Sequence, residues 1–136
     1  MQDTSTVSAD PTPSPLARAA TNCWAGKTTR TARSILGARL YSSWTSGKWC
    51  ASGKSVLSAS VVDSGQQTYW FGWKGTGKAG GGSKVVKNTG RAWTQYKFQF
   101  QLASPYPTQY TQPCTRVLGK YTGKYSGDYT CGVLWP

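Results

Sequence analysis

The sequence predicts an all-β protein, a compact antiparallel β-sandwich or small barrel with two disulfides and a flexible N-terminal arm. Apolar and polar residues alternate from Tyr96 to Leu102, as a strand with one buried and one solvated face requires. Six or more short β-branched or aromatic segments are separated by glycine and asparagine turns, with little helical periodicity. Four cysteines in 136 residues are typical of a small exported domain.

Residues 1–20 differ in composition from the rest of the chain. They have almost no apolar content up to Leu16, and three prolines at alternate positions favour polyproline II and remove backbone donors. We therefore divide the chain into an extended Pro-rich arm, 1–20, and a disulfide-bonded β-domain, 21–136. The arm is either a solvated leader or a peptide that docks in a partner's groove. The docking hypothesis assigns partner binding to five residues: Pro11, Pro13, Pro15, Leu16 and Arg18.

The first half of the β-domain gives mixed signals. Segment 30–40 predicts one short helix, because Ile35, Leu36 and Leu40 are neighbours at helical spacing, although Gly37 interrupts it. A β-branched strand is expected over 55–63.

Two features are expected to follow that strand. The pair Ser64-Gly65 predicts a turn, and segment 67–74 predicts a second strand with three aromatic residues on one face. We expect six aromatic residues to pack in the core rather than to bind a ligand: Tyr69, Phe71, Trp73, Tyr96, Phe98 and Phe100.

Segment 75–83 holds five glycines in nine residues, which predicts a mobile hairpin loop. Segments 83–88 and 92–102 are expected to pair as a hairpin joined at 89–91.

The C-terminal third begins with a proline-bearing crossing loop, 104–113, and then predicts two more strands within 116–135. These include the tandem GKYTGKYSGDY at 119–129, whose period of four fits either a continuous strand or a hairpin.

The cysteines indicate disulfides rather than a metal site. They are Cys23, Cys50, Cys114 and Cys131, none of them in a C-x-x-C pair, and the chain has no histidine to complete a zinc site. Sequence leaves three pairings open, of which we favour Cys23 with Cys50 and Cys114 with Cys131, because each pair brackets one compact segment. Such bridges imply a secreted, extracellular protein. No run of apolar residues is long enough to suggest a membrane span.

The charge is strongly unbalanced. Sixteen Lys and Arg oppose four Asp, which gives a net charge of +12. Without residues 1–20, which hold Arg18, Asp3 and Asp10, fifteen basic residues oppose two acidic ones, a net charge of +13. Such a domain attracts polyanions, among them anionic lipid, teichoic acid, nucleic acid and acidic protein surfaces. We expect no nucleic acid partner, because an extracellular domain rarely meets one.

Catalysis is disfavoured by the residues that the chain lacks. Without His or Glu, acid–base chemistry would rest on four Asp, two of them in the arm. The other two, Asp63 and Asp128, occupy turn-like contexts where Asp is ordinary. We therefore expect a binding protein rather than an enzyme, with no cofactor and no metal.

The layout resembles the adaptor subunit of streptomycete umbrella toxin particles. The matching features are the Pro-rich segment 10–18, the early Cys23-Trp24, and Cys131 and Trp135 near the end. The resemblance implies a non-enzymatic secreted adaptor that links a lectin-bearing subunit to the toxin stalk, with the arm inserted into a cleft of that subunit.

Two other interpretations remain open. A free-standing cationic antimicrobial or envelope-binding protein is one, since Trp70, Gly72, Lys74 and segment 90–93 faintly resemble bacteriocins of the lactococcin 972 type. The other is a secreted protease inhibitor, with segment 16–18 or 104–113 as the bait.

Overall fold

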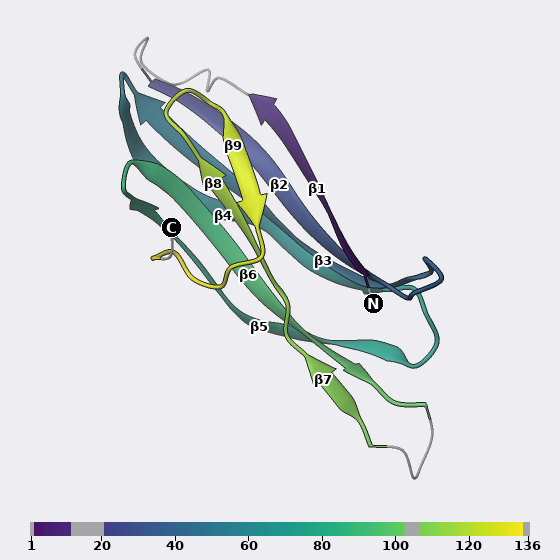
Figure 1. Ribbon diagram of the computed structural model, residues 1–136. Helices are drawn as coiled ribbons and strands as arrows, with labels where there is room; N and C mark the ends of the chain where they lie inside the picture. The colour runs from purple at the N-terminus through teal and green to yellow at the C-terminus, as the bar shows by residue number, and fades with distance from the viewer. Residues whose placement is uncertain (1, 12–20, 103–106, 135–136) are drawn as a thin grey trace.

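Two antiparallel sheets pack face to face in an elongated sandwich (Figure 1). The computed structural model describes the backbone of residues 2–11, together with residues 21–102 and 107–134. The first sheet has the order β1-β2-β3-β4, and its strands are β1 (Gln2–Pro11), β2 (Thr21–Arg33), β3 (Arg39–Ser52) and β4 (Ser55–Thr68). The second has the order β5-β6-β8-β9, with β7 paired to β6; its strands are β5 (Trp73–Val86), β6 (Thr89–Phe100), β7 (Gln109–Thr111), β8 (Cys114–Gly119) and β9 (Tyr125–Asp128). The predicted all-β sandwich is confirmed.

Both predicted disulfides are present. Cys23 and Cys50 are register partners on β2 and β3, and their sulfur atoms are bonded. Cys114 on β8 is bonded to Cys131, which follows β9. The pairing that we favoured is therefore confirmed, and the second bridge ties the C-terminal segment to the sheet.

The first half of the predicted arm is the edge strand of the first sheet. Residues Gln2–Pro11 form β1, which pairs with β2 from Gln2 opposite Arg33 to Pro11 opposite Trp24. The boundary drawn at residue 20 thus separates one strand of this sheet from the other three.

The predicted helix over 30–40 is wrong. This segment is the β2–β3 hairpin, whose turn is closed by hydrogen bonds from the Ser34 and Gly37 N–H groups to the Ala38 and Ser34 carbonyls. Gly37 has a φ of 91°, which only glycine adopts without strain. Cross-strand hydrogen bonds satisfy the backbone on both sides, and they override a helical spacing based on only three apolar residues.

The strand boundaries predicted between 55 and 74 are also wrong. Ser64-Gly65 does not turn: β4 continues to Thr68, and the Trp44 indole occupies the space that a side chain at Gly65 would need. The strand expected over 67–74 is instead divided by the β4–β5 turn, which occupies residues 69–72. Tyr69 and Phe71 therefore lie exposed, against our expectation, whereas Tyr96 and Phe98 are buried as expected.

The mobile loop predicted over 75–83 is an ordered part of β5. Its glycines pair with β6 through two irregularities, at Gly75–Gly77 and Lys78–Gly80. The bare backbone leaves room for side chains: Gln66 lies against Gly75, donates to the Lys97 carbonyl over 2.9 Å and accepts from the Gly77 N–H over 2.8 Å. Glycine here serves close packing rather than mobility.

The β5–β6 hairpin is confirmed, with its turn two residues earlier than predicted. Lys87 and Asn88 have φ of 49° and 57°, as the two-residue turns preferred by twisted hairpins require. The Asn88 side chain accepts from the Val56 N–H and donates to the Lys54 carbonyl, which ties this turn to the other sheet. In the tandem at 119–129 the hairpin alternative is present, since β8 and β9 are joined by a turn over 120–124.

The interior changes character along the sandwich. A hydrophobic cluster occupies one half: Ala32, Leu40, Tyr41, Tyr96 and Phe98. In the centre the Thr45 hydroxyl hydrogen-bonds the Thr94 and Thr115 hydroxyls across the two sheets. In the other half Trp49 is 1% exposed, and its ring fills the space above Gly90 and Gly119.

We predict that Gly119→Ala lowers the free energy of unfolding by at least about 2 kcal/mol, because the added methyl group would overlap the buried Trp49 ring. Gly80→Ala is the control: its methyl group would meet the Trp93 ring at 3.4 Å, an ordinary contact, and stability should change by less than about 1 kcal/mol. Urea unfolding followed by near-UV circular dichroism measures both. Equal effects of the two substitutions would contradict the packing assigned to Trp49.

Candidate functional site: an apolar end and its two arginines

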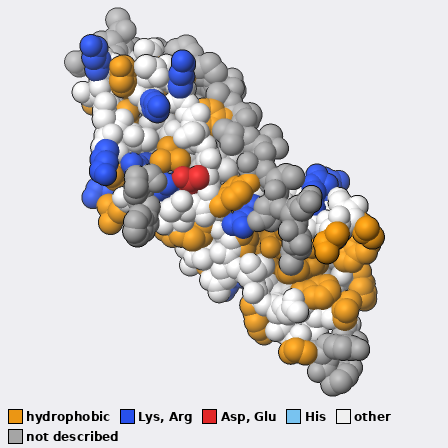
Figure 2. Space-filling view, in the orientation of Figure 1, with side chains coloured by type: hydrophobic (Ala, Val, Ile, Leu, Met, Phe, Trp, Pro, Cys, Tyr) orange, Lys and Arg blue, Asp and Glu red, His pale blue; other side chains and the backbone are white. Residues whose placement is uncertain are grey.

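Exposed apolar side chains gather at one end of the sandwich, as Figure 2 shows. We call this set the apolar end, and its members are Ile35, Leu36, Tyr69, Trp70, Phe71, Leu102 and Tyr110. They come from the β2–β3 turn, the β4–β5 turn, the chain after β6, and β7, which lie together at that end in Figure 1. Leu36 is 97% exposed, Ile35 85% and Phe71 78%. Contiguous exposed apolar surface of this kind marks an interaction site.

The β4–β5 turn is held in place by backbone hydrogen bonds. The Tyr69 N–H donates to the Leu40 carbonyl over 3.0 Å, and the Gln101 N–H donates to the Gly72 carbonyl over 3.1 Å. Gly72 has a φ of 93°, and a Cβ there would lie 2.6 Å from the Phe100 ring, so no other residue fits. The aromatic residues of this turn are therefore presented on a fixed backbone.

The apolar end continues the aromatic core. Trp73 packs between Tyr41 and Phe100, with ring centroids 4.7 and 5.0 Å away, and Tyr41 packs on Phe98 at 4.3 Å. Trp73 and Phe100, two of the six expected core aromatics, are half-buried at this boundary. The sandwich thus encloses the inner aromatic residues and leaves the outer ones in solvent.

Two arginines lie at the base of the β2–β3 turn. Arg33 Nη1 donates to the Gly37 carbonyl over 3.0 Å, which folds its side chain along the turn. The Arg39 guanidinium lies 4.3 Å from the centroid of the Tyr69 ring, a cation–π contact. Positive charge therefore borders the exposed apolar side chains.

The cation–π contacts of the described chain join residues that are distant in sequence. Besides Arg39 and Tyr69, Lys27 lies over Trp44 and Arg30 over Tyr129.

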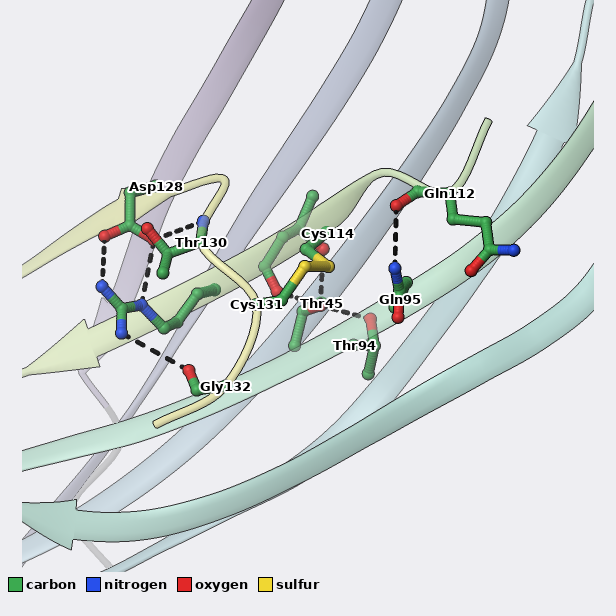
Figure 3. The surroundings of a disulfide bond; sticks show 11 residues. Thr45, Thr94, Gln95, Gln112, Cys114, Asp128, Thr130, Cys131 and Gly132 are labelled. Atoms are coloured by element: carbon green, nitrogen blue, oxygen red, sulfur yellow. Dashed lines mark hydrogen bonds and ion pairs between the residues drawn. A yellow bond between two sulfur atoms is a disulfide. The ribbon is translucent and has the colours of Figure 1, made fainter. Parts of the chain in front are cut away.

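Away from the apolar end, the buried Arg116 forms an ion pair with the partly exposed Asp128 (Figure 3). Arg116, which is fully buried, donates from Nε and Nη2 to the two Asp128 carboxylate oxygens over 2.9 and 2.6 Å. Asp128 also accepts from the Thr130 N–H over 3.1 Å, and Arg116 Nη1 donates to the Gly132 carbonyl over 3.4 Å. Burial by itself raises the pKa of Asp128, but the hydrogen bonds from Arg116 and Thr130 and the Arg116 charge outweigh it, so the pKa is lowered.

The structure does not bring together a catalytic pair of carboxylates from the domain. Asp63 lies on β4 and accepts from the Trp44 indole N–H at 3.4 Å, whereas Asp128 lies on β9 of the other sheet and is bound to Arg116. Within the described part of the chain, no three His, Cys, Asp or Glu side chains cluster as a metal site would require. No helix in that part is long and apolar enough to cross a membrane.

Of the residues predicted to bind a partner, Pro11 ends β1 opposite Trp24. Pro13, Pro15, Leu16 and Arg18 lie outside the described residues, as does the bait segment 16–18. Part of the second bait segment, 104–113, lies outside them too, and its described part includes β7.

Sequence reasoning missed the apolar end. Ile35 and Leu36 had been assigned to a helix, and Tyr69 and Phe71 to a core strand. One signal was available: Trp70 and Phe71 are adjacent, and adjacent residues of a strand cannot both face the same core.

Comparison of the chain with protein-family models, with curated protein sequences and with solved structures gives no match. The site is therefore interpreted from its own geometry.

We predict that Asp128→Asn lowers the free energy of unfolding by about 2 to 3 kcal/mol at pH 7, because Arg116 would stay buried without its counter-charge. A carboxyl whose pKa is lowered by folding stabilises fully above its unfolded pKa, near 3.9, and loses this contribution as pH falls through the folded value. The difference in free energy of unfolding between wild type and variant should therefore disappear as the pH falls below 4. Urea unfolding from pH 7 to pH 2 measures it, and a gap independent of pH would contradict the assignment.

Proposed function

We propose that the protein is a non-enzymatic, exported envelope-binding protein whose apolar end enters the interfacial layer of an anionic membrane. The observation that carries this proposal is the apolar end, with large side chains exposed on turns at one tip of the sandwich. Aromatic side chains with polar groups favour the membrane interface, where the ring is apolar and the edge stays hydrated. Trp70, Tyr69 and Tyr110 supply this type of side chain there.

Burial of the apolar end in the membrane interface gives a favourable free energy of binding. A Leu or Phe side chain moved from water into an apolar layer contributes about 1.5 to 3 kcal/mol. Leu36 and Phe71 are largely exposed, so most of this gain is available on binding. Because backbone hydrogen bonds already fix the β4–β5 turn, this turn loses little conformational entropy when the protein binds the membrane.

The charge supports the choice of an anionic surface. The β-domain carries fifteen basic and two acidic side chains, and each basic side chain near an anionic leaflet contributes about 1 kcal/mol. Arg33 and Arg39 border the apolar end, whereas Asp63 and Asp128 are engaged with Trp44 and Arg116. The positive charge of the domain and its exposed apolar surface therefore both favour binding to an anionic membrane.

We predict that Leu36→Ser with Phe71→Ser weakens binding to phosphatidylglycerol vesicles at least about tenfold, from the apolar burial that is lost. Leu57→Ser with Val62→Ser is the matched control, since these β4 residues are 57% and 54% exposed away from the apolar end. Co-sedimentation over a lipid titration measures the affinities. Absence of binding by the wild type, or equal weakening in the control, would overturn the proposal.

A second candidate is the adaptor role, and the placement of β1 favours it. Gln2 begins β1 beside Arg33 near the apolar end, whereas Pro11 and Thr21, which flank residues 12–20, lie at the opposite end. An adaptor that links two proteins, as in the toxin particles that the sequence resembles, needs contact surfaces that do not obstruct each other. The two ends of the sandwich offer such surfaces.

For this second candidate we predict that serine at Pro13, Pro15, Leu16 and Arg18 abolishes co-purification with a large secreted partner, because the substituted residues form the docking segment. The Leu36→Ser, Phe71→Ser variant should retain the same partner. Affinity capture from the culture fluid of the producing cell, with quantitative mass spectrometry, compares the two variants. An unchanged capture by the serine variant would exclude the arm as the docking segment.

A further inference from the structure

Arg33 and Arg39 are direct cross-strand partners on β2 and β3. Like charges placed opposite each other in a sheet are destabilising, so the pair adds nothing to the stability of the hairpin. The neighbouring positions do not compensate for this charge. The β1 partner of Arg33 is the uncharged Gln2, and the pairing of β3 with β4 begins only at Tyr41 opposite Thr68.

Each guanidinium is held by uncharged groups of the same end. Arg33 donates one N–H to the Gly37 carbonyl, and Arg39 lies on the Tyr69 ring. A guanidinium has five N–H donors, and these contacts use one N–H of Arg33 and the face of Arg39. Two arginines with side chains ordered in advance lose less conformational entropy when they bind an anion.

The position of the pair matches the depth of a lipid headgroup. Leu36 lies three residues beyond Arg33 and three before Arg39, a reach of at most about 10 Å in extended chain. Side chains of interfacial proteins enter the headgroup and acyl boundary by about 5 to 10 Å. When Ile35 and Leu36 are buried to that depth, the arginines therefore lie in the layer of the phosphates.

From this arrangement we infer that Arg33 and Arg39 together bind the phosphate group of an anionic phospholipid. The inference rests on the proposed membrane function and names the group recognised there. Arginine is suited to this role, because its planar fork donates two parallel hydrogen bonds to a phosphate, which the ammonium group of lysine cannot do.

The test uses the full chain and two types of vesicle with equal surface charge, one made anionic by phosphatidylglycerol and the other by oleate. Wild type should bind the phosphatidylglycerol vesicles about tenfold more tightly, as hydrogen bonds to a charged phosphate imply. Arg33→Lys with Arg39→Lys keeps the net charge and should remove this preference while leaving oleate binding unchanged. Arg30→Lys, on the same strand but in contact with Tyr129, is the matched control and should keep the preference.

The outcomes separate the two proposals. If wild type binds neither vesicle, the membrane function fails and the phosphate site fails with it. If wild type binds both vesicles equally, or the double lysine variant keeps the preference, the phosphate site is overturned and the membrane function stands. Displacement from phosphatidylglycerol vesicles by millimolar inorganic phosphate at constant ionic strength would assign the site to free phosphate and overturn the lipid assignment. Thermal unfolding of each variant checks that the fold is retained.

Discussion

The close approach of glycine backbone to large aromatic rings is the constraint on which this sandwich depends. Gly90 and Gly119 of the second sheet leave the space that the Trp49 ring of the first sheet occupies, and Gly26 does the same for Tyr125. A side chain at any of these positions would force the two sheets apart, because packed interiors have little free volume. Glycines at these positions thus allow a small domain to bury its largest side chains.

The narrow interior explains the polar centre. Small side chains bring the sheets close together at their middle, where Thr45, Thr94 and Thr115 satisfy one another's hydroxyl groups. The Thr28 hydroxyl donates to the Arg116 carbonyl and adds a further link between the sheets. Buried polar groups with partners cost little and fix how the sheets align, because a slip in register would leave all of them unpaired.

The middle of the sandwich and its apolar end are stabilised in different ways. Near the middle, where Cys114 precedes the central Thr115, the second disulfide and the Arg116–Asp128 pair fasten the C-terminal segment over β8. At the apolar end the Trp70 and Phe71 side chains are exposed, although backbone hydrogen bonds fix the turn that carries them. The cross-links near the middle therefore leave the apolar end available as a contact surface.

Sequence by itself determined the fold class and the presence of a β5–β6 hairpin, because alternation and turn residues are local signals. It favoured the observed disulfide pairing but left two other pairings open. It also indicated that four Asp without His or Glu offer little for acid–base catalysis. Only the tertiary structure decided that glycine segment 75–83 is strand, that segment 30–40 is a hairpin and that Tyr69 and Phe71 lie outside the core. Those outcomes depend on cross-strand hydrogen bonds and on contacts with side chains that are distant in the sequence. The pairing of Arg33 with Arg39 at the apolar end likewise follows from strand register, which a single sequence does not reveal.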